Sequence, residues 1–144
     1  MWEGHVLLLL ERETLELSLK PLSNGQPETF RAPFEDSAHY TDRKSLAEKL
    51  SNFVFSTKHS LLLQPGSRNQ VTFDAFSISR DGIVTIFQMT VGENHSIKAS
   101  GLDFIWDAIR DAEMMADSKG RLETLKSFLP RKDNKWRLVF CVPR

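Results

Sequence analysis

One acidic residue stands in an unusual place for its type. Asp74 lies in an apolar segment beside Phe76, in a stretch whose residue alternation predicts a strand. Burying a lone carboxylate is costly, so Asp74 needs a partner, a metal ion or solvent. The turn sequence Asp81-Gly82 predicts a hairpin, and the strand that follows it brings Gln88 and Thr90 nearest to Asp74. These three residues form the first candidate site.

The chemistry that such a group could perform is metal-dependent phosphodiester hydrolysis. An acid on one strand, an acid or amide on the next and a nearby lysine can hold a divalent cation and orient water. The alternative is structural. Asp74 would then lie at a solvated strand edge, and Gln88 would bond a neighbouring backbone group, because residues of these types are mostly exposed.

His95 is a second candidate, since a histidine titrates near neutral pH. It could act as a general base, or donate to a phosphate near the start of a helix predicted from about Leu102. The alternative is a loop histidine that bonds the backbone. The other histidines are dispersed, and the single cysteine, Cys141, lies in an apolar run where a buried thiol is expected, so no zinc site is predicted.

Charge is unevenly distributed along the chain. Residues 117–144 carry eight basic and three acidic side chains, although the whole chain has a formal net charge of zero. A basic end can meet the phosphates of DNA or RNA, and it can equally be solvated surface. The candidate nucleic-acid-binding residues are Arg131, Lys132, Lys135 and Arg137.

Several short phrases occur in a distinctive order: Asp74, then FQMTV at 87–91, HSIK at 95–98, Gly101-Leu102, and FCVP at 140–143. In this order the chain resembles the C-terminal module of Crinkler and retrotransposon hot spot proteins. The resemblance covers about Ser60 to Arg144. It implies an effector module with a restriction-endonuclease-like fold, whose PD-(D/E)xK motif places an Asp on one strand and an acid-x-Lys on the next.

This chain departs from that motif. Asp74 matches the Asp, but Gln88 occupies the position of the second acid and Thr90 that of the lysine. Lys98 could replace the lysine from the start of the following helix, and Glu48 could replace the carboxylate from the first helix. A Gln carbonyl can bind Mg²⁺ without contributing charge, so without Glu48 the affinity of Asp74 and Gln88 for Mg²⁺ should be weak. The resemblance therefore implies a nucleic-acid-contacting domain with a variant or inactive catalytic site.

A different class of function is a protein-interaction module on a non-catalytic α/β scaffold. In that case exposed aromatic residues such as Trp2 and Trp106 would meet a partner.

The elements that must position these residues form an α/β domain. Alternating patterns predict an opening hairpin from 6–10 and 14–19, followed by a long loop to about residue 42. We then expect, in order, a helix with Ser45 as N-cap and Glu48 in its capping box, three strands, two helices and a last strand; the ranges are 45–56, 60–63, 71–79, 83–91, 102–116, 121–128 and 136–142. The prediction is a single domain, 1–144, with a mixed sheet flanked by helices over about 43–144.

Composition excludes several classes. The apolar run 6–10 is far shorter than the ~20 residues of a membrane span, and the chain start lacks the basic region of a signal peptide. No glycine-rich phosphate loop occurs among the seven scattered glycines. An intracellular protein, cytoplasmic or nuclear, is expected.

Overall fold

The computed structural model describes residues 16–19, 28–31, 34–53, 58–66, 73–89, 99–117, 128–130 and 136–141. The chain divides into two compact units, Met1–Phe34 and Glu35–Arg144. In the first unit, strand β1 (Glu16–Leu19) pairs antiparallel with β2 (Glu28–Arg31), and Glu16 lies opposite Arg31.

The strand pairing near the chain start differs from the prediction. β1 falls within the predicted strand 14–19, but its partner β2 lies in the stretch predicted to be a loop. Strand β3 (Asp36–Tyr40) lies in the same stretch. Residues 6–10 are outside the described part of the chain. The loop prediction was wrong because β2 and β3 have little apolar alternation of their own, and pairing with a neighbour decides their conformation.

The second unit contains a five-stranded mixed sheet in the order β3-β4-β5-β6-β7. β3 is parallel to β4, β5 is antiparallel to both its neighbours, and β6 is parallel to β7. The other bounds are β4 (Ser60–Pro65), β5 (Ala75–Ser79), β6 (Val84–Met89) and β7 (Arg137–Cys141). The α/β class and the mixed sheet are as predicted.

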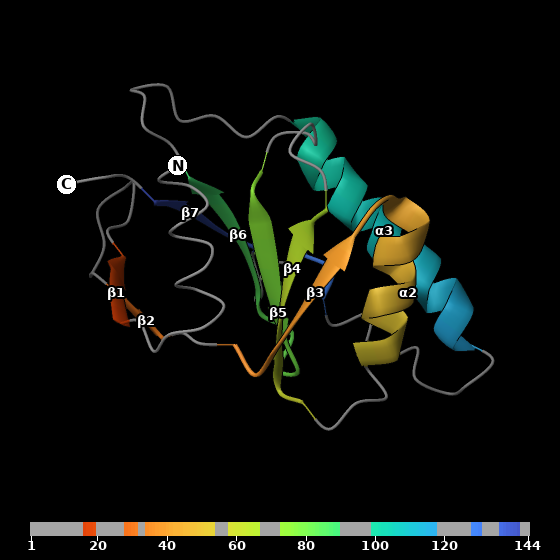
Figure 1. Ribbon diagram of the computed structural model, residues 1–144, viewed down its shortest axis with the longest axis horizontal. Helices are drawn as coiled ribbons and strands as arrows, with labels where there is room; N and C mark the ends of the chain where they lie inside the picture. The colour runs from red at the N-terminus through yellow and green to blue at the C-terminus, as the bar shows by residue number, and fades with distance from the viewer. Residues whose placement is uncertain are drawn as a thin grey trace. The chain divides into compact units, whose positions relative to one another are not determined.

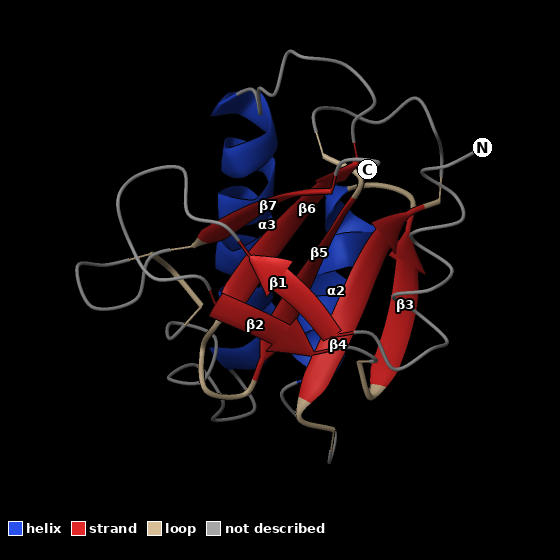
Figure 2. Cartoon of the chain, turned by 90° about the vertical axis from the view of Figure 1, so that its left-hand side faces the viewer, coloured by secondary structure: helices blue, strands red, loops and turns tan. Residues whose placement is uncertain are grey.

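Two helices, α2 (Arg43–Phe53) and α3 (Ala99–Asp117), lie side by side on one face of this sheet (Figure 1). Seen from the other face, both helices lie behind the strands (Figure 2). Between sheet and helices lies one apolar core. It includes Phe76 and Ile86 from the sheet, Leu50 from α2 and Ile105 from α3, all completely buried.

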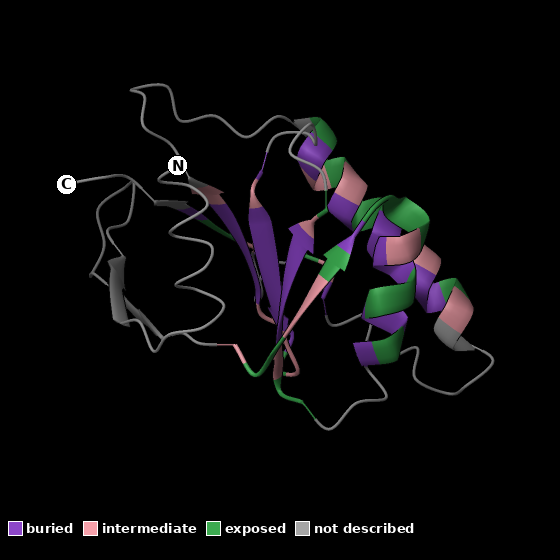
Figure 3. Ribbon diagram, viewed as in Figure 1, coloured by how far each residue is buried: buried purple, intermediate pink, exposed green. Residues whose placement is uncertain are grey.

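The central strands are buried on both faces (Figure 3). Val84, Thr85, Ile86 and Phe87 of β6 are each at most 1% exposed, although consecutive side chains point to opposite faces. This confirms the prediction that β6 is an interior strand covered on both sides, which its near-continuous apolar sequence indicated.

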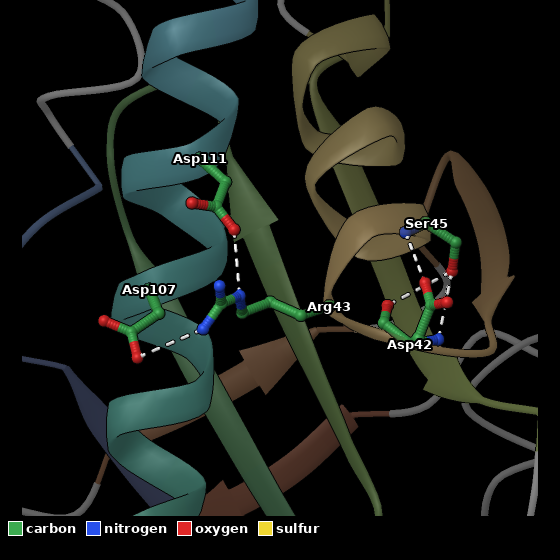
Figure 4. A network of polar contacts seen from close by, with 5 residues as sticks. All are labelled: Asp42, Arg43, Ser45, Asp107 and Asp111. Atoms are coloured by element: carbon green, nitrogen blue, oxygen red, sulfur yellow. Dashed lines mark hydrogen bonds and ion pairs between the residues drawn. The ribbon is translucent and has the colours of Figure 1, made fainter.

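The first turn of α2 is held by a reciprocal capping box (Figure 4). The backbone N–H of Ser45 donates to Asp42 Oδ1 at 2.7 Å, and the N–H of Asp42 donates to Ser45 Oγ at 3.3 Å. The predicted N-cap, Ser45, is therefore the third residue of the helix, and Glu48 is not in the box. Asp42 takes the N-cap position because its carboxylate can accept from the first-turn N–H groups.

A tight hairpin joins β5 and β6, as the Asp81-Gly82 sequence predicted. The N–H of Gly82 donates to the Ser79 carbonyl and the N–H of Ser79 donates to the Ile83 carbonyl, both at 3.0 Å. Gly82 has a φ of 89°, a conformation that side chains rarely adopt. This is a three-residue loop with glycine at its left-handed position.

The remaining helix and strand predictions agree with the described residues at the level of element type. The predicted helix 121–128 lies outside the described residues except for Phe128, which is completely buried. The prediction of a single domain stays a prediction. Within the described part of the chain, neither helix has the length and apolar character required for a bilayer span.

Candidate functional site

The candidate site lies at one end of the strands of the sheet. Four strands, β3, β4, β6 and β7, run in the same direction and end there, while β5 begins there. Asp74 directly precedes β5, and Gln88 is the second-last residue of β6. The carboxyl edge is where open α/β sheets bind their ligands, so the topology gives this pair a favourable location.

Asp74 and Gln88 are neighbours through the backbone of Phe87. The N–H of Asp74 donates to the carbonyl oxygen of Phe87 at 3.0 Å, although Phe87 is already the register partner of Ala75. This hydrogen bond lies where the β5–β6 ladder ends, because β5 begins at Ala75.

Both side chains are half-buried. Asp74 is therefore neither fully buried nor fully solvated, which were the two alternatives that the sequence left open. The amide oxygen of Gln88 is itself inaccessible to solvent.

Glu48 is placed away from this pair. It is exposed on α2, whereas its neighbours Ala47 and Leu50 are completely buried on the core side of the helix. The Glu48 carboxylate therefore faces solvent and not the β5–β6 strands. Among the described residues, no group of three or more His, Cys, Asp or Glu side chains gathers as a metal site. Mg²⁺ binding by Asp74 and Gln88 stays a prediction.

The other candidates are mostly outside the described residues. Thr90 follows the end of β6, and Lys98 directly precedes α3; neither is described, and the same holds for His95, Arg131, Lys132 and Lys135. Arg137 is described: it is exposed at the start of β7 and pairs in register with Thr85. Arg137 therefore lies at the opposite end of the strands from Asp74.

The sequence reasoning missed Tyr40, at the carboxyl end of β3. Tyr40 is 1% exposed and contacts the rings of Phe76 and Phe104, with centroid distances of 6.4 and 5.9 Å. Burial raises the pKa of its phenol well above the ordinary value, because the anion would lose its hydration. Its carbonyl accepts from the N–H of Gly66 at 2.8 Å, at the end of the β3–β4 pairing. An isolated aromatic in a polar stretch was the available signal.

Gln64 was also missed. It lies on β4, is 6% exposed, and its Nε2 atom has no acceptor among the described residues. The register places it next to His39 of β3, which is exposed. A single amide in the otherwise apolar run of β4 was the signal that could have identified it.

Polar contacts also connect the loops at the opposite end of the strands, where β3 and β4 begin and β5 ends. Glu35 accepts from the N–H of His59 at 3.1 Å and donates its own N–H to Ser60 Oγ at 3.0 Å. Arg80 donates from Nε to the Lys58 carbonyl at 2.6 Å. Because these side chains are already bonded to the backbone, this end of the strands is a structural junction.

Comparison with known proteins found no matching family model, no matching curated protein and no matching solved structure.

Proposed function

We propose that this chain is a Crinkler-like or retrotransposon-hot-spot-like effector domain with a nuclease-related fold, which contacts nucleic acid and has a degenerate catalytic site. The observation that supports it most is the backbone hydrogen bond from the Asp74 N–H to the carbonyl of Phe87, the residue that precedes Gln88 on β6. A PD-(D/E)xK site has its Asp and its acid-x-Lys on adjacent strands, and here Asp74 directly precedes β5 while Gln88 lies on the neighbouring strand β6.

The residues favour binding over hydrolysis. One carboxylate and one neutral amide offer a divalent cation a single negative charge, and Glu48 is turned to solvent. Mg²⁺ beside a phosphate is usually held by one or two carboxylates together with the phosphate, so a single carboxylate gives the least anionic form of such a site. The proposed degenerate site therefore retains nucleic-acid contact through the basic residues and has little or no Mg²⁺-dependent cleavage.

Restoring the motif tests this proposal directly. The double substitution Gln88→Glu and Thr90→Lys gives the strand its acid-x-Lys pattern, and we expect it to add Mg²⁺- or Mn²⁺-dependent cleavage of DNA or RNA that the native chain lacks. The same double substitution with Asp74→Asn should be inactive, because the cation loses its remaining carboxylate. Asp36→Asn, an exposed acid at the other edge of the sheet, is the matched control.

Cleavage by the native chain that disappears in Asp74→Asn and Lys98→Ala would show an active variant site instead. If the restored motif gives no cleavage, and the native chain binds neither single- nor double-stranded nucleic acid at low salt, the proposal fails.

A protein-interaction module is the second candidate. It is favoured by Trp106 and Met114, two large apolar side chains exposed on α3. Absence of nucleic-acid binding together with a protein complex that Trp106→Ala disrupts would select it.

A further inference from the structure

The solvent-facing stripe of α3 combines apolar and charged residues in a regular pattern. Trp106, Arg110 and Met114 follow each other at four-residue intervals and are all exposed, with Trp106 39% and Met114 80% accessible. Residues four apart lie on one side of a helix. Asp103, also exposed, lies one turn before Trp106 on the same side.

Most of the remaining circumference of α3 is occupied. Ile105, Ala108, Ile109 and Ala112 are completely buried against the core. On the side toward α2, Arg43 pairs with Asp111 at 2.9 Å and with Asp107 at 3.7 Å (Figure 4). The stripe of Asp103, Trp106, Arg110 and Met114 lies outside these core and Arg43 contacts, and the exposed Asp107 borders it.

The charges of this stripe are complementary to those of the same stripe on a second copy of the chain. Asp103 and Arg110 are equally far, about 5 Å along the helix axis, from the midpoint between Trp106 and Asp107. If a second α3 crosses antiparallel at that midpoint, each Arg110 faces an Asp103 and the two Trp106 rings meet at the centre. Asp103 forms no ion pair within the described residues, and Arg110 has only a 3.9 Å contact to Glu113 and remains 60% exposed.

We infer that this stripe is a self-association surface, on which a second copy of the chain packs its own α3 in antiparallel, two-fold symmetric contact. Two reciprocal Asp103–Arg110 pairs flank a central Trp106 pair, and Met114 covers the first turn of the opposite helix. An isologous contact needs such self-complementarity, and a parallel arrangement would place like charges together.

A single helix pair buries less surface than the ~1,600 Å² of a standard stable interface. The dimer is therefore weak, and it forms over a range of about 10 μM to 1 mM chain. Sedimentation velocity over this range measures it directly. The expected result for the native chain is a monomer–dimer equilibrium.

Charge reversal provides a test that distinguishes this geometry from nonspecific adhesion. Either Asp103→Arg or Arg110→Asp alone places like charges opposite each other at both symmetric Asp103–Arg110 positions. Each single substitution should raise the dimer dissociation constant at least tenfold. The double variant exchanges the charges, so it should recover to within about threefold of the native value. Trp106→Ala should abolish the dimer, and Lys49→Glu on α2 is the matched control with no expected effect.

Circular dichroism and thermal unfolding must show that every variant is folded. A native chain that stays monomeric at about 1 mM overturns the inference. So does a dimer that persists in Trp106→Ala, or a double variant as weak as its single components. Because nucleic acid is absent from these measurements, the result is independent of the proposed function.

Discussion

At the residue scale, Tyr40 gives the molecule a direct optical probe of its core. It is the single tyrosine of the chain, and it is buried between Phe76 and Phe104. A phenol without access to water is held in its neutral form, so ionisation of Tyr40 reports the opening of the β3 end of the core.

The raised pKa of Tyr40 predicts a loss of stability in alkali. The unfolded chain releases the phenolic proton from about pH 10, whereas the folded chain retains it, so the free energy of unfolding falls as pH rises above about 10. Tyr40→Phe removes this contribution. We expect the native chain to lose more stability than Tyr40→Phe between about pH 9 and about pH 11.5, measured by urea unfolding.

Tyrosinate absorbance provides the check on this assignment. In the folded native chain it should appear only with unfolding. A tyrosinate signal near pH 10 while circular dichroism is still native would contradict the burial of the phenol.

The capping box at the start of α2 predicts a second residue-scale effect. Asp42→Ala removes the acceptor of the 2.7 Å bond from Ser45 N–H and should cost about 1 kcal/mol of unfolding free energy. Adding Ser45→Ala should cost less than the sum of the two single changes, because both residues serve one box. Lys44 is exposed in the same turn, so Lys44→Ala should change the free energy of unfolding by less than about 0.5 kcal/mol. Equal costs for Asp42→Ala and Lys44→Ala would refute the cap.

At the scale of elements, α2 has one buried and one solvated side, and they should respond differently to truncation. Leu50 is completely buried in the core, so Leu50→Ala should cost about 2–5 kcal/mol. Glu48→Ala changes an exposed residue two positions away and should cost less than about 0.5 kcal/mol. Urea midpoints measure both. A large cost for Glu48→Ala would mean that its carboxylate has a structural or ligand-binding role.

At the scale of the whole molecule, the neutral formal charge conceals a basic end, because residues 117–144 hold eight of the nineteen Lys and Arg side chains. If this end binds phosphates, nucleic-acid affinity must fall steeply with salt. Replacing Arg131, Lys132, Lys135 and Arg137 by Ala should flatten the slope of log K against log salt by about 0.9 for each phosphate that the variant no longer neutralises.

Fluorescence anisotropy over a salt series measures this slope, and Lys44→Ala with Lys49→Ala on α2 is the control for total charge. An unchanged slope in the four-residue variant would place the nucleic-acid interface elsewhere.

The fold of the second unit could be predicted where sequence patterns are strong. The apolar run of β6, the glycine of its hairpin and the periodic apolar positions of α3 each indicated the observed element. β2 and β3 could not be predicted, because their stability comes from the strands they pair with and not from their own residues.

The candidate site was predictable only in part. The proximity of Asp74 to the Phe87–Gln88 backbone follows from the hairpin, which the Asp81-Gly82 turn indicated. The start of β5 at Ala75, which leaves Asp74 just outside the strand, could not be foreseen, because the predicted strand covered 71–79. The outward direction of Glu48 follows from helix periodicity, because Glu48 lies about half a turn from both Leu46 and Leu50, which are completely buried.

The mixed direction of the sheet also has a consequence for the order of folding. The antiparallel strands β4, β5 and β6 are joined by short connections, whereas β6 ends at Met89 and its parallel partner β7 starts at Arg137. Closing so long a loop costs entropy before any new pairing compensates for it, so β7 should dock late. Until it docks, the apolar edge of β6 is open to other chains, and aggregation during refolding should start at that edge.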